Sequence, residues 1–287
     1  MSYLTVSTLE EALTSLSDSS GKARVVAGAT DLFLQDLPHS LVDLSALPEI
    51  TVVEEKDGLI SIGAAVTHTA AASSSLILAR ARALAEGCSA VGSPQIRNIG
   101  TIGGNVINAA PAADAAVALI SLGAEAVLID VNRETRQEAV ENLYWTYNRS
   151  LVDSSKEILL RLLVKPCLGG EGSAFTRFAV RRALALPMVN AAARVKLENG
   201  LVKKVRLVAA PVRPAPTRLI QTEELVINQP VDKDTLKRVE VSAAGEVEVR
   251  GSQLRCSARY RQHLVGVLIA RALKIAADRA DPGKAGD

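Results

Sequence analysis

Alternating apolar and polar positions predict two β-hairpins, one in each half of the chain. The stretch from Val52 to Gly63 alternates on either side of Asp57-Gly58, a dipeptide that favours the tight turn of a hairpin. The stretch from Arg194 to Val208 alternates in the same way across Asn199-Gly200, with charged residues on one face. We therefore expect antiparallel sheet in both halves, and one side of the second hairpin should face solvent.

Apolar residues at helical spacing predict several helices. A capping box at Ser7 to Glu10 starts a first helix, from about Thr8 to Leu16. Later helices are expected from about Ser73 to Gly87 and from Ala113 to Leu122. After Ser257, an apolar stripe opposed by arginines predicts an amphipathic C-terminal helix, and its members are Leu264, Leu268, Ala272 and Ile275.

A first glycine turn follows a short apolar strand near the N-terminus. The strand is predicted from Ala23 to Ala27, the turn is Gly28-Ala-Thr-Asp31, and the apolar run Leu32 to Leu34 comes next. A strand, a tight turn and the start of a helix form an arrangement that can hold an anion. No Lys-Ser or Lys-Thr follows the glycine and no GxGxxG is present, which weakens kinase-like and Rossmann interpretations.

A second glycine turn, at Gly103-Gly104, lies in the run from Val91 to Ala116. Another turn is predicted before it at residues 92–97, and a strand is predicted after it at residues 125–130. Gly103-Gly104 lets main-chain N–H groups approach an anion, and Thr101 and Asn105 add short hydrogen-bonding side chains. Asp114 further on can accept from a pair of hydroxyl groups, so the two turns together suit a nucleotide with a diphosphate and a ribose. The alternatives are a turn without a ligand and, favoured by spacing alone, a helix N-terminal role for the acid.

Composition and charge exclude several other functions. The 287 residues contain 33 basic and 31 acidic side chains, and no basic block with interleaved aromatics suggests nucleic-acid binding. The start has no signal-peptide pattern and no stretch suits a membrane helix, so we expect a cytoplasmic protein. The isolated Cys88, Cys167 and Cys256 predict neither a disulfide framework nor a metal site.

Two clusters have both a functional and a structural interpretation. Three arginines could contact a ligand, although a solvated face is the commoner role for Arg177, Arg181 and Arg182. Three aromatic residues could stack on a flavin, but a packing cluster under a loop is the commoner role for Tyr144, Trp145 and Tyr147. No Ser–His–Asp or Cys–His arrangement is evident, so any chemistry should belong to a bound cofactor.

Four motifs occur in an order typical of one protein family. They are VVAGATDL (Val25–Leu32), GSPQIRNIGTIGGNVINAAPAAD (Gly92–Asp114), KEILL (Lys156–Leu160) and SARYRQHLVGVLIARAL (Ser257–Leu273). On these motifs the chain resembles the separate FAD-binding medium subunit of the molybdenum hydroxylases, the group that contains xanthine dehydrogenase, carbon monoxide dehydrogenase and nicotinate dehydrogenase. The resemblance covers nearly the whole length of the chain.

The resemblance implies an α+β fold. A two-part FAD-binding domain of the vanillyl-alcohol-oxidase-like (PCMH) type would occupy residues 1–168, with its parts divided near residues 55–60. The glycine-rich stretch at residues 169–174 is expected to be a linker, because three glycines in four positions are costly to order. A smaller C-terminal α/β domain with antiparallel sheet would follow at residues 175–280, and residues 281–287 would form a frayed tail.

The resemblance also implies the residues that bind FAD. The first loop would hold the pyrophosphate with Val25, Val26, Ala27, Gly28, Ala29 and Thr30. The second loop would contribute Thr101, Gly103, Gly104 and Asn105, and the acid on the ribose would be Asp114. The flavin ring would be lined by Val91, Ile107, Ile158 and Leu159, with a cationic contact from Arg177. No catalytic residue and no metal ligand of the chain's own is implied.

Three positions depart from the family pattern. Ala29 stands where a glycine is common, and a left-handed backbone there would cost about 1–2 kcal/mol. Val91 stands where some relatives have an aromatic residue, and Ala185 where many have an aspartate. These differences affect the binding and shielding of the flavin rather than the fold.

The implied activity is that of an electron-transfer subunit in a hetero-oligomer. Its partners would be a molybdopterin-binding large subunit and a [2Fe–2S] small subunit, and FAD would pass electrons to NAD or another acceptor. The chain has no four-cysteine insertion for a cluster of its own. The alternatives are an assembly or nucleotide-binding module that has lost FAD and a stand-alone flavin oxidoreductase, although no residue resembles a substrate acid or base.

Overall fold

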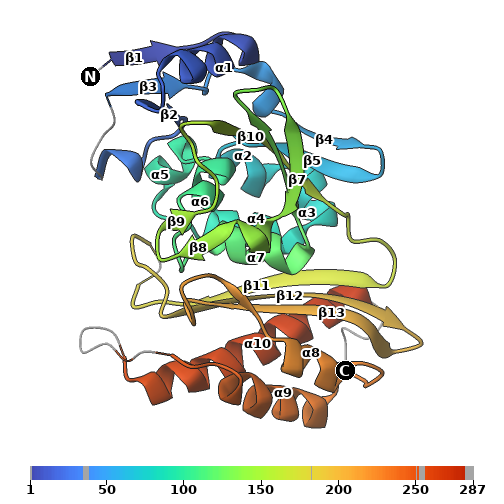
Figure 1. The fold of residues 1–287 in the computed structure, drawn as a ribbon. Helices are drawn as coiled ribbons and strands as arrows, with labels where there is room; N and C mark the ends of the chain where they lie inside the picture. Colours follow the sequence, from blue (N-terminus) through green and yellow to red (C-terminus); the bar gives the residue numbers. More distant parts are fainter. Residues whose placement is uncertain (1, 35–38, 182, 250, 252–255, 282–287) are drawn as a thin grey trace.

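The computed structural model describes residues 2–34, 39–181, 183–249, 251 and 256–281. Its elements form layers, with a three-stranded sheet at the N-terminal end, a five-stranded sheet and a group of helices in the middle, and a four-stranded sheet backed by helices at the other end (Figure 1). This mixture of helices with largely antiparallel sheet confirms the predicted α+β class.

The N-terminal layer is a parallel sheet of β1 (Ser2–Thr5), β3 (Ser40–Asp43) and β2 (Ala23–Val26), in that order. Helix α1 (Leu9–Asp18) packs on it through buried Ala, Leu and Leu side chains. The capping box lies one residue later than predicted, because Thr8 caps the helix and Glu11, not Glu10, returns to the backbone. The Glu11 carboxylate also accepts from the N–H of Ser7.

The central sheet has the order β4-β5-β10-β6-β7, and its described pairings are antiparallel. Its strands are β4 (Val53–Lys56), β5 (Leu59–Gly63), β10 (Glu157–Val164), β6 (Glu125–Asp130) and β7 (Thr135–Ala139). The predicted hairpin at residues 52–63 and the predicted strand at residues 125–130 are confirmed. The hairpin turns at Asp57 and Gly58, which both have positive φ, as a tight hairpin turn requires.

Several short helices lie beside this sheet. They are α2 (His68–Ser73), α3 (Ser75–Arg80), α4 (Arg82–Ser89), α5 (Pro94–Ile99), α6 (Ile102–Ile107) and α7 (Asp114–Leu122). The single helix expected at residues 73–87 breaks at Ala81, whose ψ of 49° interrupts the helical backbone. The turn expected at residues 92–97 contains α5, which Ser93 caps and Pro94 starts. The helix predicted at residues 113–122 is confirmed as α7.

The C-terminal sheet has the order β11-β12-β13-β14. It consists of β11 (Glu171–Phe178), β12 (Val189–Glu198), β13 (Leu201–Ala210) and β14 (Thr217–Arg218), with α8 (Ile220–Val226), α9 (Lys233–Gly245) and α10 (Ala258–Ala280). The predicted second hairpin and the C-terminal helix are confirmed. The face of the hairpin that was expected to be in solvent is only partly exposed, because Arg194 and Arg206 donate to carbonyl groups at the end of α7. Residues 171–174 of the expected linker form the start of β11, where Gly172 lies so close to α10 that an added Cβ would be 2.0 Å from the Ala276 carbonyl oxygen. Of the expected tail, residues 282–287 lie outside the described residues.

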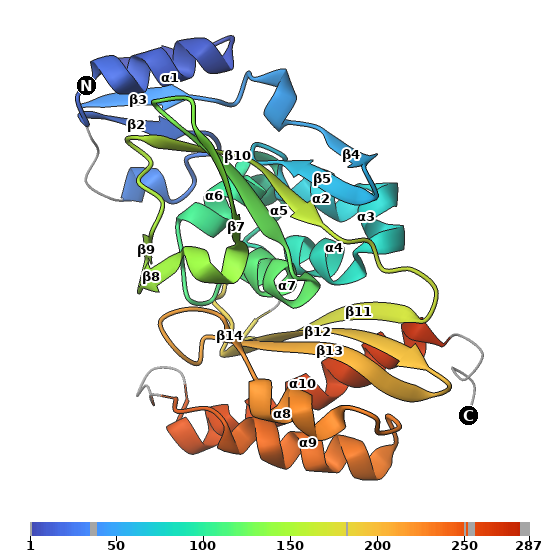
Figure 2. The same ribbon diagram turned by 45° about the vertical axis from the view of Figure 1, so that its right-hand side comes forward.

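The central helices join the two larger sheets. Helices α4 and α7 lie between the five-stranded sheet and the face of β11–β13, while α10 covers the opposite face of the C-terminal sheet and α9 packs on α10 (Figure 2). All nine residues of α7 are buried. Ion pairs cross this junction, including Arg279 with Glu86 and Arg177 with Asp114. The middle layer is therefore fixed from both sides, and it carries the second glycine loop on α6.

Candidate cofactor site

The two glycine loops touch each other. The first loop follows β2 and ends in the short 3-10 helix η1 (Leu32–Leu34), and the second loop joins α5 to α6. A Cβ built on Gly28 would lie 2.2 Å from the Ile99 carbonyl oxygen, so only glycine permits this contact. The two glycine loops therefore lie side by side in the structure, as the sequence interpretation requires.

The first loop presents unpartnered backbone donors. Among the described residues, the N–H groups of Gly28, Ala29 and Thr30 have no hydrogen-bond acceptor in the protein. The backbone of Ala29 has a φ of 56°, which is the left-handed conformation anticipated for this position. Successive N–H groups around a left-handed residue form a concave donor set that suits an anion. This loop thus has the donors that a diphosphate requires.

The second loop contributes differently from the sequence interpretation. Gly103 and Gly104 form the first turn of α6 rather than a separate turn, and their N–H groups are already satisfied, by the Ala64 carbonyl at 2.9 Å and by Thr101 Oγ1 at 3.1 Å. A Cβ on Gly103 would be 2.6 Å from Ala64, so this glycine is required for packing against the end of β5. The available polar groups of this loop are the Thr101 hydroxyl and the Asn105 amide.

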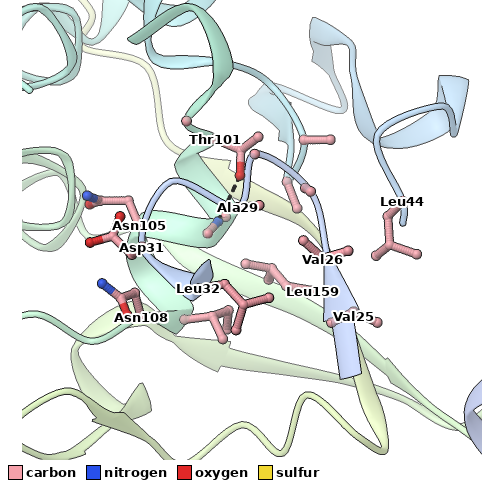
Figure 3. Close-up of a pocket in the computed structure, with 18 of the residues that line it drawn as sticks. Val25, Val26, Ala29, Asp31, Leu32, Leu44, Thr101, Asn105, Asn108 and Leu159 are labelled. Carbon is pink, nitrogen blue, oxygen red and sulfur yellow. Dashed lines mark hydrogen bonds between the residues drawn. The ribbon is translucent and has the colours of Figure 1, made fainter. Parts of the chain in front are cut away.

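Both loops border a pocket with a volume of about 1050 Å³, including its open mouth. This volume is at the upper end of the range typical of ligand sites. Polar side chains of Asp31, Asn105 and Asn108 lie on one side, and apolar side chains including Val26 and Leu159 lie on the other (Figure 3). The pocket therefore suits a long ligand that has both charged and apolar parts.

Most of the predicted site residues border this pocket. Those that do are Val25, Val26, Ala27, Gly28, Ala29, Thr30, Val91, Thr101, Gly103, Gly104, Asn105, Ile107 and Leu159. Ile158 does not, because neighbouring residues of a strand face opposite sides, and its side chain is packed in the core under α1 while Leu159 faces the pocket. Asp114 and Arg177 are also absent from the lining.

Asp114 and Arg177 instead bind each other in the junction between α7 and β11. Arg177 Nε lies 3.2 Å from Asp114 Oδ2, and Asn190 Nδ2 donates to Oδ1 at 2.6 Å. Arg177 also donates to the Ala185 carbonyl. Burial raises the pKa of Asp114 to about 6, against the opposing effects of Arg177 and Asn190. Asp114 lies at the start of α7, which agrees with the helix N-terminal role that its spacing in the sequence favours. Through Arg177 and Asn190 it also links this helix to the C-terminal sheet.

His68 is a pocket residue that the sequence did not single out. It starts α2, is only 2% exposed, and lies beside the second loop, since its Cδ2 would be 3.4 Å from a Cβ on Gly100. Its Nδ1 is buried without a hydrogen-bond partner. Burial, with a smaller effect of Arg97, lowers the pKa of His68 to about 4, so the ring is neutral at pH 7. No local sequence pattern distinguishes such a histidine from one that is simply packed.

The aromatic cluster does not match the packing interpretation. Tyr144 packs against the central core, but Trp145 is 64% exposed and Tyr147 is also exposed. They lie on a small hairpin of β8 (Tyr144–Thr146) and β9 (Arg149–Ser150), whose short strands bury one aromatic side chain and leave the others outside. Of the arginine cluster, Arg181 is exposed and donates to the Leu184 carbonyl, while Arg182 lies outside the described residues.

The pocket fits a nucleotide cofactor on the observations above. Loop 28–30 offers unpartnered N–H groups, Asn105 Oδ1 is buried without a partner, and Gly104 leaves room beside Thr101 for a ligand. Apolar side chains on the other wall suit a flat ring. Within the described part of the chain, no cluster of possible metal ligands is found, and none of its helices is long and apolar enough to cross a membrane.

Comparison with known proteins identifies the family. Residues 1–164 match the FAD binding domain in molybdopterin dehydrogenase, and residues 174–276 match the CO dehydrogenase flavoprotein C-terminal domain. The chain belongs to this family of FAD-binding flavoproteins. The expectations of an FAD cofactor and of an oxidoreductase subunit of the molybdenum hydroxylase type are thereby confirmed.

Individual relatives agree with this assignment. The chain is 29% identical over 279 residues to the xanthine dehydrogenase FAD-binding subunit of Escherichia coli O157:H7, covering 95% of this chain and 94% of the relative. It is 29% identical over 221 residues to the nicotinate dehydrogenase FAD-subunit of Eubacterium barkeri, covering 74% of each. Its fold is similar to that of a chain of carbon monoxide dehydrogenase from Hydrogenophaga pseudoflava, with a TM-score of 0.90, 24% identity and coverage of 97% and 98%. The last likeness confirms the predicted fold class.

Proposed function

We propose that this chain is the FAD-carrying electron-transfer subunit of a molybdopterin-dependent hydroxylase or dehydrogenase of the xanthine dehydrogenase type. It would take electrons from [2Fe–2S] centres on a partner and pass them to NAD or another acceptor. The observation that carries the proposal is the contact of the two loops at Gly28 and Ile99, beside a pocket that is lined by residues 28–30, whose N–H groups are unpartnered. The family assignment supplies the identity of the ligand for this pocket.

The residues of the chain would bind and orient the cofactor. N–H groups of Gly28, Ala29 and Thr30, with the Thr101 hydroxyl and the Asn105 amide, would hold the diphosphate. Bound FAD supplies the redox chemistry, by accepting single electrons and passing on a pair. The pocket walls would exclude water from the ring and fix its position.

Several predicted contacts remain part of this proposal. Val91, Ile107 and Leu159 border the pocket and would line the ring. A ribose contact of Asp114 and a flavin contact of Arg177 would require FAD to approach the ion pair that these residues form with each other. Asp114 lies at the start of α7, a few residues beyond α6, and holds Arg177 beside it, which supports such an approach.

The protein would work in a complex. Relatives are named as FAD subunits, medium chains or a subunit of a dehydrogenase complex, which supports partners that carry molybdopterin and [2Fe–2S] centres. We propose a division into an FAD-binding domain at residues 1–168 and a C-terminal domain at residues 175–280, supported by the two family matches. A cytoplasmic location is also part of the proposal, and the free thiols of Cys88, Cys167 and Cys256 suit a reducing compartment.

The decisive experiment is the visible absorption spectrum of the purified chain, followed by chromatography of the ligand that heat denaturation releases. Released FAD near one per chain is the expected result, and partner copurification is then the next step. No flavin after incubation with excess FAD would overturn the proposal and favour a module that has lost its cofactor. Full substrate turnover by the isolated chain would instead favour a stand-alone flavin oxidoreductase.

A further inference from the structure

His68 is a buried titratable residue to which the proposed function assigns no task. It starts α2, is only 2% exposed, and borders the cofactor pocket. Among the described residues its imidazole ring has no hydrogen-bond partner, and its Nδ1 is fully enclosed. Buried polar groups in proteins are nearly always hydrogen-bonded, so an unpaired ring at the edge of a pocket points to a ligand as its partner.

The main chain fixes His68 against the second loop. Backbone hydrogen bonds join residues 64–68 to residues 100–103, and within this pairing the His68 N–H donates to the Gly100 carbonyl at 3.0 Å. The same short segment carries the Thr101 hydroxyl, which borders the cofactor pocket. The imidazole is therefore held in place by the backbone that also positions a proposed cofactor contact.

The ring is also a neighbour of the first loop. A Cβ built on Gly100 would lie 3.4 Å from His68 Cδ2 and 3.5 Å from Thr30 Oγ1, so both side chains lie beside the same glycine. Thr30 belongs to the run of unpartnered N–H groups at residues 28–30. The imidazole thus lies among the groups that would hold the diphosphate of FAD.

The protonation of the ring suits hydrogen-bond donation. Burial, with a smaller effect of Arg97, lowers the pKa of His68 to about 4, so the ring is neutral at pH 7 and carries a single N–H. A proton on Nδ1 would have no acceptor, which places it on Nε2, the ring nitrogen that can meet a ligand in the pocket. An N–H in this position can donate to an anionic oxygen, and such hydrogen bonds are stronger than neutral ones.

We propose that His68 is a further cofactor-binding residue, whose Nε2–H donates a hydrogen bond to a diphosphate oxygen of FAD. The inference rests on the proposed function, because it requires FAD in this pocket. It adds a side-chain donor to a site where the first loop offers main-chain N–H groups. It also gives a reason for a polar ring at a buried position, where an aliphatic side chain would leave no nitrogen unpaired.

Substitution separates a ligand-binding role from a packing role. His68→Leu removes the donor together with the unpaired Nδ1, so the apo chain should be at least as stable as the wild type in urea titrations at neutral pH. Its Kd for FAD should nevertheless rise about tenfold, because one charge-assisted hydrogen bond is lost. His68→Gln keeps an N–H donor and should bind FAD within about threefold of the wild type.

Thr69→Val is the matched control for these variants. Thr69 is the next residue of α2, is exposed, and does not border the cofactor pocket. Its hydroxyl donates to the Asn98 side chain rather than to a group of either loop. This variant should bind FAD with the wild-type Kd.

A direct measurement does not depend on how His68→Leu folds. The chain contains three histidines, so NMR of the full-length chain with ¹⁵N-labelled histidine gives few ring signals, and the signal lost in His68→Gln belongs to His68. FAD and ADP both carry a diphosphate and should shift the Nε2–H signal of His68. Riboflavin has no diphosphate and should leave this signal unchanged.

The other outcomes overturn the inference. A chain that binds FAD without a shift of the His68 signal, or a folded His68→Leu variant with the wild-type Kd, overturns it and leaves the proposed function intact. A shift with riboflavin but not with ADP would place the ring at the flavin and also overturns it. If His68→Leu loses stability, the NMR titration alone decides. A chain that binds no FAD overturns the proposed function and this inference together.

Discussion

Ala29 carries backbone strain at the centre of the first loop. Its φ of 56° is left-handed, and this conformation costs a residue with a Cβ about 1–2 kcal/mol. Replacement by glycine removes this cost, but it also makes the unfolded chain more flexible, which offsets part of the gain in stability. We expect Ala29→Gly to raise the free energy of unfolding by about 0.5–1 kcal/mol in urea titrations of the apo chain. Ala27→Gly is the control, because Ala27 does not have a positive φ and its replacement should destabilise. A less stable Ala29→Gly variant would contradict the strain argument.

His68 should make stability depend on pH. Its pKa is about 4 in the folded chain and near its ordinary 6.5 when unfolded, so the unfolded state binds the proton more tightly. Stability from this residue is therefore present above pH 6.5 and falls, by about 3 kcal/mol in full, as the pH drops toward 4. His68→Gln should lack this loss in denaturant unfolding measured at several pH values. His263→Gln, on the exposed side of α10, should keep the wild-type profile.

At the scale of elements, α6 should matter for the cofactor more than for the fold. Gly104 borders the pocket, and an added Cβ would meet only the Thr101 hydroxyl, at 2.9 Å. Gly104→Val should therefore retain its secondary structure by circular dichroism but lose FAD, with a Kd raised more than tenfold. Gly245→Val is the matched control, because a Cβ there meets nothing within 4 Å. A Gly104→Val variant that purifies with full FAD would remove this loop from the site.

At the scale of the whole molecule, the N-terminal region should depend on the C-terminal sheet. All nine residues of α7 are buried, and this helix packs on β12 and β13. A fragment ending at residue 168 would expose this apolar surface and the Asp114 carboxylate, which would lose Arg177 and Asn190. We expect such a fragment to aggregate or to bind a hydrophobic dye in light scattering and fluorescence assays. A monodisperse fragment that binds FAD would show that the region folds alone.

The sequence by itself determined the local features of this protein. The Asp57-Gly58 and Asn199-Gly200 hairpins, the C-terminal helix and the first glycine loop were predictable, because turn chemistry and apolar periodicity depend on neighbouring residues. The family motifs added FAD and the class of enzyme subunit. Most residues predicted to contact the cofactor border one pocket for the same reason, since they belong to short contiguous loops.

Only the tertiary structure decided how these features work together. The α6 donors are occupied by Ala64 and Thr101, Ile158 turns into the core, and Asp114 pairs with Arg177, 63 positions away. His68 borders the pocket, and Trp145 is exposed, because of how distant segments pack around them. Hydrogen-bond partners, strand faces and burial depend on contacts between distant segments, and no local sequence pattern specifies such contacts.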